Sequence, residues 1–359
     1  MNHFFDVSKI SGIQAQYEAQ KIAFAPIIFQ AVRVLRDSGI LKLLHENKSG
    51  MSIDTIAQHL SMTTYAVTVL LESGFSASVV SKDEELFTLT KIGYFLLNDP
   101  MTRVNMDFNH YVNYLGLYEL DKAVERGDPA GLKVFGEWET IYPGLMSLPE
   151  DAKKAWFDFD HFYSDSAFVE ALKIIGEKSP KRLLDIGGNT GRFSRLCAQT
   201  LPECHMTIVD LPQQLAVAKI ENEEAGLSSR IDTYAADMLK DETYLPDGYD
   251  SAWMSQFLDC FGEEDIVKIL SKIENSMDEN GKIYILEPMW DRQRYETSAY
   301  CLINTSPYFT AMANGKSKMF NLGELTRCLV KAGLVISEIH DDVGFCHSLI
   351  VCEKKSKGQ

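Results

Sequence analysis

The chain contains few basic residues for its length. Its 359 residues include 51 Asp and Glu against 35 Lys and Arg, which gives a formal net charge of −16 at pH 7. An acidic surface repels phosphate backbones and anionic lipids, so neither nucleic acid nor a membrane surface is expected as a partner. The chain also lacks an apolar run long enough for a membrane span, because Arg33, Arg36, Asp37 or Glu72 interrupts its most apolar stretches.

The cysteines show no paired spacing. There are seven, an odd number, and none belongs to a C-x-x-C motif; they occupy positions 197, 204, 260, 301, 328, 346 and 352. This pattern argues against a zinc site and against a disulfide framework, so we expect no metal. The opening residues, MNHFFDVSKI, lack the basic and apolar segments of a secretion signal. We therefore expect a cytoplasmic protein.

The first hundred residues, 1–100, are expected to form a mostly helical domain. Residues 22–44 are apolar on more than one face, which is typical of a helix buried against a second subunit. Residues 52–75 have helical spacing with Ser52 and Ser61 as N-caps, and 76–90 predict a hairpin. This order is a winged-helix pattern. It has no Lys or Arg from 51 to 81, so a dimerisation module is favoured over a DNA reader.

Residues 101–178 predict a helical connector rich in aromatic side chains. Two interpretations are open: helices packed in a core, or a wall of a pocket for an aromatic substrate, and both can hold together. His110, Asp158 and His161 are the polar candidates in this connector. The residues expected to line such a pocket are Phe159, His161, Phe162, Tyr163 and His110.

From residue 179 to 359 strands alternate with helices. The expected strands are 182–186, 205–210, 230–237, 250–254 and 282–287, followed by a closing hairpin of 334–340 and 346–353. Five alternating units and a hairpin predict an α/β fold with a mostly parallel, doubly wound sheet and one reversed strand.

The stretch LLDIGGNTGRF, residues 183–193, contains a glycine-rich turn after the first of these strands. A dinucleotide fingerprint needs G-x-G-x-x-G, and neither Gly187 nor Gly188 starts one. No G-K-[ST] closes the turn, so a Walker loop is also missing. What remains is an acid, Asp185, glycines for a sharp bend, and Gly191 at the helix start. Asn189 replaces a further glycine and tolerates positive φ.

Two more acids are expected where the next strands end. Asp210 closes TIVD, where a carboxylate can accept both hydroxyls of a ribose. Asp237 closes YAAD and precedes Met238, which suits an adenine. Three such acids match a nucleoside that has no phosphates and carries a sulfonium charge. The alternative is that Asp is common at strand ends and caps for structural reasons.

Together with the winged-helix pattern, the segments LLDIGGNTGRF, IVDLPQQ and AADML resemble the dimeric small-molecule O-methyltransferases, both plant caffeic-acid and chalcone types and bacterial antibiotic-tailoring enzymes. The resemblance implies a Rossmann-like domain that binds S-adenosyl-L-methionine, and a homodimer that swaps N-terminal helices. It implies that Gly187 and Asp210 hold the amino-acid and ribose ends, while Asp237 and Met238 bracket the adenine. The full expected cofactor-binding set is Asp185, Gly187, Gly188, Gly191, Asp210, Leu211, Asp237, Met238 and Ser255.

The catalytic segment departs from that family's pattern. Where the family has M-K-x-x-x-H-D-W, this chain has MSQFLDCF, with Ser255 at the lysine position and Asp259 at the histidine position. Glu287 matches the first of two flanking glutamates, and no acid stands at the second, near 318–319. An ordinary Asp pKa of about 3.9 is low for a base acting on a phenol. Burial beside Phe257 and Phe261, or a nearby Glu287, would raise it.

Asp259 and Glu287 are thus the catalytic candidates, and several interpretations stay open. Asp259 is a tuned base, or the substrate is acidic enough to need only proximity, or Asp259 is a capping or surface residue. The favoured function is S-adenosylmethionine-dependent methyl transfer to a small aromatic or polyketide-like acceptor. The alternatives are other chemistry with the same cofactor, such as decarboxylation or hydroxylation, and a winged-helix regulator that senses it.

Overall fold

The computed structural model describes residues 4–5 and 9–355, and the chain divides into two compact units. The first unit ends at Tyr111 and the second starts at Val112. The three-part division expected from the sequence, at residues 100 and 178, stays a prediction. Within the described residues no helix combines the length and the apolar character that crossing a bilayer requires.

The N-terminal unit is built from helices and one hairpin. The strands β1 and β2 pair antiparallel, and Met51 adds a single bridge to Phe87 of β2. The core of this unit is apolar and closed, with Leu35, Leu41 and Ile56 fully buried. The predicted order of helix, turn, helix and hairpin is confirmed. The elements are α1 (Gly12–Asp37), α2 (Ile40–Glu46), α3 (Ile53–Leu60), α4 (Thr64–Ser76), β1 (Val80–Asp83), β2 (Leu86–Leu89), α5 (Lys91–Asn98), α6 (Pro100–Phe108) and the π-helix η1 (Asn109–Asn113).

Two local predictions in this unit are wrong. Residues 22–44 are two helices, because Gly39 adopts a left-handed φ of +89° between α1 and α2, a conformation that only glycine adopts without strain. Ser52 caps α3 as predicted. Ser61, however, ends α3 with a φ of +51°, and the Thr63 hydroxyl caps α4 instead by accepting from the Ala66 amide at 3.2 Å.

The second unit opens with short helices and one long helix, and continues as a seven-stranded sheet. The helices before the sheet are η2 (Gly116–Glu119), α7 (Leu120–Arg126), η3 (Ala130–Val134), η4 (Tyr142–Ser147) and α8 (Glu150–Glu177). The strands are β3 (Arg182–Ile186), β4 (His205–Asp210), β5 (Ile231–Ala235), β6 (Tyr249–Ser255), β7 (Met277–Glu287), β8 (Leu334–Val343) and β9 (His347–Lys354). The remaining helices are α9 (Arg192–Thr200), α10 (Pro212–Glu224), η5 (Leu258–Cys260), α11 (Glu263–Ser276), η6 (Trp290–Arg292), α12 (Glu296–Tyr308), the π-helix η7 (Phe309–Ala313) and α13 (Leu322–Lys331).

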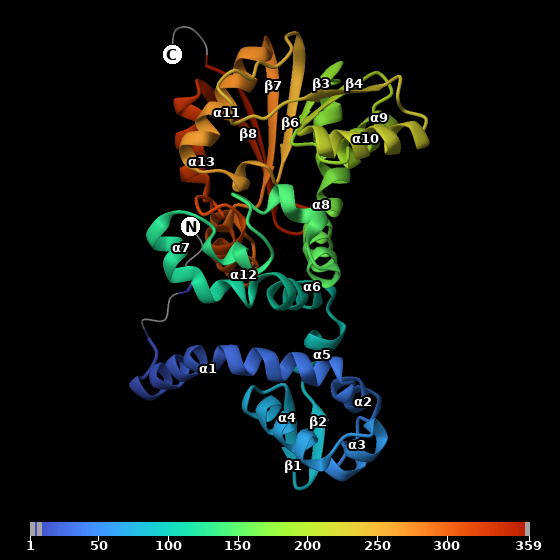
Figure 1. Cartoon of the computed structure of the whole chain (residues 1–359), viewed down its shortest axis with the longest axis vertical. Helices are drawn as coiled ribbons and strands as arrows, with labels where there is room; N and C mark the ends of the chain where they lie inside the picture. The colour runs from blue at the N-terminus through green and yellow to red at the C-terminus, as the bar shows by residue number, and fades with distance from the viewer. Residues whose placement is uncertain (1–3, 6–8, 356–359) are drawn as a thin grey trace. The chain divides into compact units, whose positions relative to one another are not determined.

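The sheet has the order β5-β4-β3-β6-β7-β9-β8, and helices cover both faces. Only β9 runs against its neighbours, which confirms the predicted single reversed strand. Helices α11 and α13 lie on one face, and α8, α9 and α10 on the other (Figure 1). On the second face Trp253 stacks on Phe193 with ring centroids 4.0 Å apart. Each such buried side chain stabilises the fold by roughly 1.5–3 kcal/mol.

The strand order locates the place where a ligand is expected. The chain moves outward from β3 through β4 to β5, and then crosses to the other side of β3 to form β6. In doubly wound sheets, ligands bind beyond the carboxyl ends of the strands at this change of direction. The loops that follow β3, β4 and β6 begin at Gly187, Leu211 and Gln256. They therefore form the candidate site.

Candidate active site

The glycine-rich turn after β3 is a left-handed bend. Gly187 and Gly191 have φ values of +70° and +82°, and Asn189 has +50°, as expected for its position. A Cβ on Gly187 would lie 2.2 Å from the ring of Phe257, so a larger residue does not fit. A Cβ on Gly188 would lie 2.8 Å from the Asp185 carboxylate. Glycine is therefore required at both positions because the turn packs closely against Phe257 and Asp185.

Asp210, the last residue of β4, connects its strand to the glycine-rich turn. Its carboxylate accepts from the Asn189 amide at 2.8 Å and from the Leu211 amide at 2.6 Å, through different oxygens. Burial raises the pKa of Asp210, and these two amide bonds oppose the rise. Each oxygen keeps a further lone pair for a hydroxyl donor. The arrangement fits two adjacent hydroxyls of a ribose.

Asp185 lies behind the turn, in β3. It is buried and accepts from the Ser194 hydroxyl of α9 at 2.6 Å. Burial raises its pKa to about 7, the Ser194 bond lowers it, and the charge of Asp210 raises it further. Because its hydrogen-bond partner is Ser194, Asp185 holds the start of α9 against the sheet. A direct bond from Asp185 to a ligand stays a prediction.

A pocket of about 590 Å³ opens between the ends of β4 and β5. The sequence predicts Asp237 at the end of a strand, but β5 ends at Ala235, so Asp237 belongs to the following loop. Its carboxylate accepts from the Leu239 amide at 3.0 Å, and Met238 beside it is buried. The volume lies within the range of small-molecule sites. The lining residues are Leu211, Pro212, Gln213, Tyr234, Ala235, Ala236, Asp237, Lys240, Glu242, Thr243 and Tyr244.

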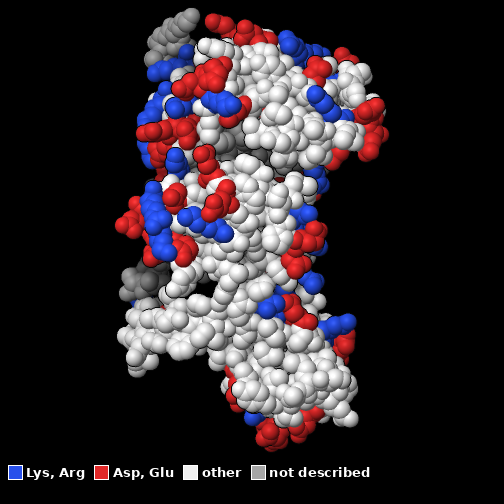
Figure 2. Space-filling model, in the orientation of Figure 1, with Lys and Arg blue, Asp and Glu red and all other residues white. Residues whose placement is uncertain are grey.

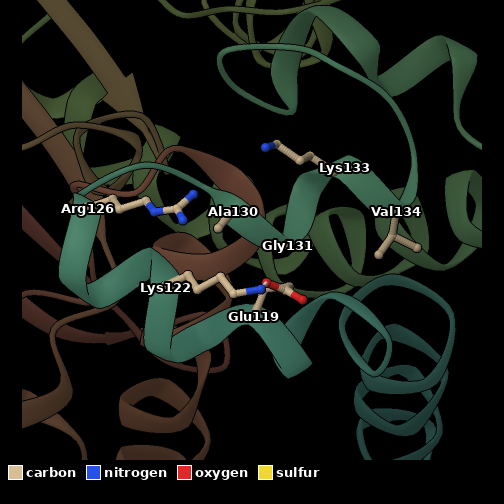
Figure 3. Close-up of a pocket in the computed structure, with 7 residues that line it drawn as sticks. All are labelled: Glu119, Lys122, Arg126, Ala130, Gly131, Lys133 and Val134. Carbon is tan, nitrogen blue, oxygen red and sulfur yellow. Dashed lines mark hydrogen bonds and ion pairs between the residues drawn. The ribbon is translucent and has the colours of Figure 1, made fainter.

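A second cavity, of about 550 Å³, lies on α7 and η3 and has different walls (Figure 3). Lys122, Arg126 and Lys133 surround it, and Lys122 is ion-paired with Glu119. No strand contributes to this cavity, and none of the predicted site residues lines it. It is therefore separate from the strand-end site.

Asp259 lies in the short helix η5 and is buried, with 6% of its surface exposed. Its carboxylate accepts from the weak S–H donor of Cys260, at 3.6 Å, and from its own backbone amide. Burial raises the pKa of Asp259 to about 7, the Cys260 contact lowers it, and the charge of Asp160 raises it again. The expected burial of Asp259 is confirmed. The rings of Phe257 and Phe261 pack edge to face with centroids 4.9 Å apart, and their contact with the Asp259 carboxylate stays a prediction.

Glu287, the last residue of β7, anchors the segment that carries Asp259. Its Oε1 accepts from the amides of Phe257 and Leu258 at 3.0 and 2.8 Å. Its Oε2 is buried and has no hydrogen-bond partner. Burial and then the charge of Asp259 raise the pKa of Glu287 well above its ordinary value. The two candidate catalytic acids are thus neighbours: Glu287 ends β7, and Asp259 lies in η5, which follows the adjacent strand β6.

Residues outside the predicted site complete this cluster. The Asn314 side-chain amide donates to the Cys260 carbonyl at 2.9 Å and to the Tyr142 hydroxyl at 3.4 Å. The Trp156 indole donates to the Tyr308 hydroxyl at 2.7 Å. Burial raises the pKa of both tyrosines, so both hydroxyls are neutral at pH 7. One sequence pattern points to part of this cluster: Trp156 and Asp160 form W-x-x-x-D in α8, and residues four apart share a helix face.

The predicted pocket residues of α8 lie on different faces. Phe159 and Tyr163 are in ring contact at 5.0 Å. Phe162 stacks on Phe345 at 5.0 Å, with the ring planes 5° apart. His161 lies beside Phe157 at 5.8 Å, and its pKa is lowered by burial and then by Arg192. None of the described contacts of His161 involves the acid cluster.

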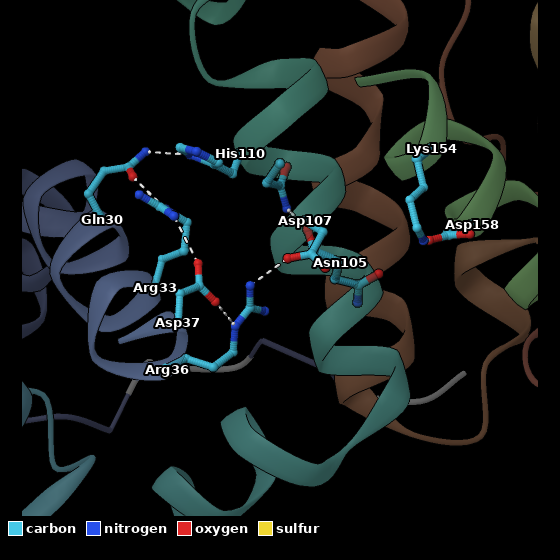
Figure 4. Close-up of polar contacts among 10 residues, drawn as sticks. Gln30, Arg33, Arg36, Asp37, Asn105, Asp107, His110, Lys154 and Asp158 are labelled. Atoms are coloured by element: carbon cyan, nitrogen blue, oxygen red, sulfur yellow. Dashed lines mark hydrogen bonds and ion pairs between the residues drawn. The ribbon is translucent and has the colours of Figure 1, made fainter. Parts of the chain in front are cut away.

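His110, the other predicted pocket residue, belongs to the N-terminal unit (Figure 4). Its ring is 3.1 Å from the Gln30 side-chain amide, and its pKa is lowered by burial and then by Arg33. Asp158, also considered from the sequence, is exposed and ion-paired with Lys154. Over residues 4–5 and 9–355, no cluster of His, Cys, Asp and Glu has the arrangement of a metal site.

Two domain families match the chain. A Dimerisation2-like domain matches residues 16–87, and an O-methyltransferase domain matches residues 163–333. The L-tyrosine C(3)-methyltransferase of Streptomyces lavendulae is 25% identical over 87% of this chain and 85% of its own length. The demethylspheroidene O-methyltransferase of Rhodobacter capsulatus is 25% identical over 77% of this chain and 67% of its own length. The S-adenosylmethionine-dependent methyltransferase SibL has the same fold, with a TM-score of 0.70 at 21% identity over 93% of this chain and 98% of its own.

The residues at the strand ends fit the cofactor of that family. The turn leaves no room for a Cβ at Gly187, Asp210 has lone pairs available, and the Ser255 hydroxyl at the end of β6 is buried without a partner. The pocket beside Asp237 offers space for a base. No triphosphate or pyrophosphate motif competes with this assignment. The chain belongs to the S-adenosylmethionine-dependent O-methyltransferase family and uses S-adenosyl-L-methionine.

Proposed function

We propose that the protein methylates the hydroxyl of a small aromatic acceptor and that Asp259 accepts the hydroxyl proton. The observation that carries this proposal is the burial of Asp259, with a pKa of about 7, within electrostatic reach of the buried side chains of Tyr142 and Tyr308. A base whose pKa lies near the working pH is the most effective at removing a proton during a reaction. Burial thus gives this carboxylate a proton affinity that an exposed Asp lacks.

Each polar group of the site has a defined task in this mechanism. The bound cofactor supplies an electrophilic methyl group, and Asp210 and Asp237 would hold its ribose and adenine. The acceptor oxygen would take the methyl group as the carbon–sulfur bond breaks, which leaves S-adenosylhomocysteine, while the hydroxyl proton passes to the Asp259 carboxylate. Glu287 fixes the segment of Asp259 through the Phe257 and Leu258 amides. The buried walls exclude water, so positioning contributes much of the rate.

A second candidate is methylation of the ring carbon beside the hydroxyl. It is supported by the relative named L-tyrosine C(3)-methyltransferase, which aligns over most of the chain. Both reactions start from the same phenolate, because loss of the hydroxyl proton makes the oxygen and the adjacent carbon nucleophilic. Carbon methylation then requires that the methylated ring carbon lose its proton. Asp259 or its neighbour Glu287 would accept this proton.

We also propose that the protein is a homodimer that forms through the N-terminal helices. Helix α1 exposes a row of large apolar side chains, among them Ile13, Ile22 and Ile27 with 84%, 76% and 63% of their surfaces exposed. The surface of this unit is mostly free of charge in the view of Figure 2. Apolar area of this kind marks an interface, and the matched dimerisation family begins within α1. The seven free thiols support a reducing compartment such as the cytoplasm.

The direct test is to incubate the purified protein with S-adenosylmethionine and a panel of phenols and carboxylic acids, and to measure S-adenosylhomocysteine. We expect its release with phenols, and NMR of the product shows whether oxygen or carbon carries the methyl group. The Asp259→Asn protein is the matched control and should turn over far more slowly. Release with carboxylic acids alone, or equal rates for the two proteins, would contradict the proposal.

A further inference from the structure

Helix α8 contributes one carboxylate to the acid cluster, and none of the described residues gives it a hydrogen bond. Asp160 lies one helical turn after Trp156, whose indole donates to Tyr308 at 2.7 Å, so both side chains share the helix face toward Tyr308. The charge of Asp160 acts on Tyr308 and on Asp259. No described residue donates a hydrogen bond to this half-buried carboxylate.

The protein also supplies little positive charge to this cluster. Among the described residues no cation acts on Asp259, and the one cation that acts on Asp160 is Arg192. Arg192 is already ion-paired with Asp165 at 2.7 Å. The Oε2 atom of Glu287, nine-tenths buried and next to Asp259, has no partner either. An ionised carboxylate shielded from water is normally paired or hydrogen-bonded, and otherwise it takes up a proton. The pKa values of Asp259 and Glu287 are raised, whereas Asp160, with a pKa of about 6, is ionised at pH 7 and lacks a counter-charge of its own.

The cofactor provides only part of what is missing. Its sulfonium carries one positive charge and no N–H or O–H donor. Its ammonium belongs to the amino-acid end, which the glycine-rich turn at Gly187 is expected to hold. A bound acceptor is the other molecule that enters this site. An ammonium group would supply both a charge and donors, and charge-assisted N–H to carboxylate bonds are about twice as strong as neutral ones.

We propose that the acceptor carries a protonated amine that binds Asp160, while its hydroxyl faces Asp259. The substrate class is therefore hydroxylated aromatic amines. This inference rests on the proposed function and specifies its substrate. It separates the tasks of the two acids, because Asp160 binds the acceptor through its charge and Asp259 takes the proton from its hydroxyl.

The test compares three phenols of nearly equal size that differ in side-chain charge: tyramine, 4-ethylphenol and 3-(4-hydroxyphenyl)propionate. Their dissociation constants are measured by calorimetry on the protein saturated with S-adenosylhomocysteine. We expect tyramine to bind wild type about tenfold more tightly than 4-ethylphenol, and the propionate to bind least. In Asp160→Asn the ratio of the 4-ethylphenol dissociation constant to the tyramine dissociation constant should fall to about one. Asp158→Asn, an exposed acid on the same helix that is ion-paired with Lys154, should keep the wild-type ratio.

A pH series on wild type checks the same claim without a substitution. Burial and the charge of Asp165 raise the pKa of Asp160 to about 6, Arg192 opposes the rise, and Asp259 and Tyr308 face it from η5 and α12. Because the amine of tyramine stays protonated below pH 9, the tyramine preference should decrease as pH falls below about 6.

The outcomes separate the two proposals. If 4-ethylphenol binds and is methylated but tyramine has no advantage, or if Asp160→Asn keeps that advantage, the amine proposal is wrong and the proposed function stands. If none of the three phenols binds while S-adenosylhomocysteine does, the proposed function is wrong, and the amine proposal with it. Binding of S-adenosylhomocysteine to each variant verifies that it is folded.

Discussion

Replacing the buried carboxyl of Asp259 with an amide is expected to make the protein more stable at neutral pH, although it slows turnover. The pKa of Asp259 rises from 3.8 to about 7 in the folded protein, mainly because of burial. Three pKa units correspond to at most about 4 kcal/mol of cost for the ionised form. Burying the amide of Asn costs roughly 1–3 kcal/mol. We therefore expect Asp259→Asn to gain about 1–3 kcal/mol in the free energy of unfolding at pH 8.

The pH dependence follows from the direction of the pKa shift. Below pH 4 the carboxyl is protonated in the folded and unfolded chains, and it contributes no difference. Between pH 4 and 7 the folded protein retains a proton that the unfolded chain has lost, so wild type loses stability as pH rises. Above pH 7 the penalty is constant. The advantage of Asp259→Asn should grow from pH 4 to 7 and then level off.

The assay is thermal or chemical unfolding of the cofactor-free proteins at pH 5, 7 and 8.5. Asp158→Asn serves as the control, because Asp158 is exposed and ion-paired with Lys154 and should change stability little at any of these values. An Asp259→Asn protein that is no more stable than wild type at pH 8.5 would refute the burial argument. So would an advantage that is the same at pH 5 as at pH 8.5.

Three further predictions follow. If ionised Asp259 is the base, kcat/KM rises about tenfold per pH unit below pH 7 and levels off above it. A flat pH profile would show that Asp259 is not the base and that the protein acts by positioning the reactants alone. Asp107→Ala should cost about 2 kcal/mol on chemical denaturation, because the buried Arg36 guanidinium then keeps only Asp37 as an acidic partner (Figure 4), and unchanged stability contradicts this. Ile27→Asp should convert the dimer to monomers by sedimentation, since it places a charge on the apolar face of α1, whereas a persisting dimer places the interface elsewhere.

The sheet could be predicted from the sequence because the strands of a parallel sheet are buried on both faces and so appear as short apolar runs. Helix α1 was harder to delimit. It begins at Gly12 and includes Pro26, a residue that normally interrupts a helix, and its exposed apolar residues do not follow a core pattern. The break at Gly39 depends on a φ value that no apolar periodicity encodes.

Some residues of the candidate site could be predicted from the sequence, and others are brought to it only by tertiary packing. Asp210 and Gly187 could be found because they follow strands directly, and Glu287 because it ends one. For Asp160 the sequence offers only the W-x-x-x-D spacing, which places it on the helix face of Trp156, and its burial shows only when the opposite elements are in place. Tyr142 and Asn314 come from segments far from η5 in the chain, and only tertiary packing brings them to it.

The central claim is that the strand-end carboxylates form a site for a nucleoside with a sulfonium charge. Calorimetric titration of S-adenosylmethionine into wild type and Asp210→Ala tests it most directly, with NAD as the competing ligand. We predict binding to wild type, loss of binding in Asp210→Ala, and no binding of NAD. Equal affinity of the two proteins for S-adenosylmethionine, or displacement of it by NAD, would contradict the claim.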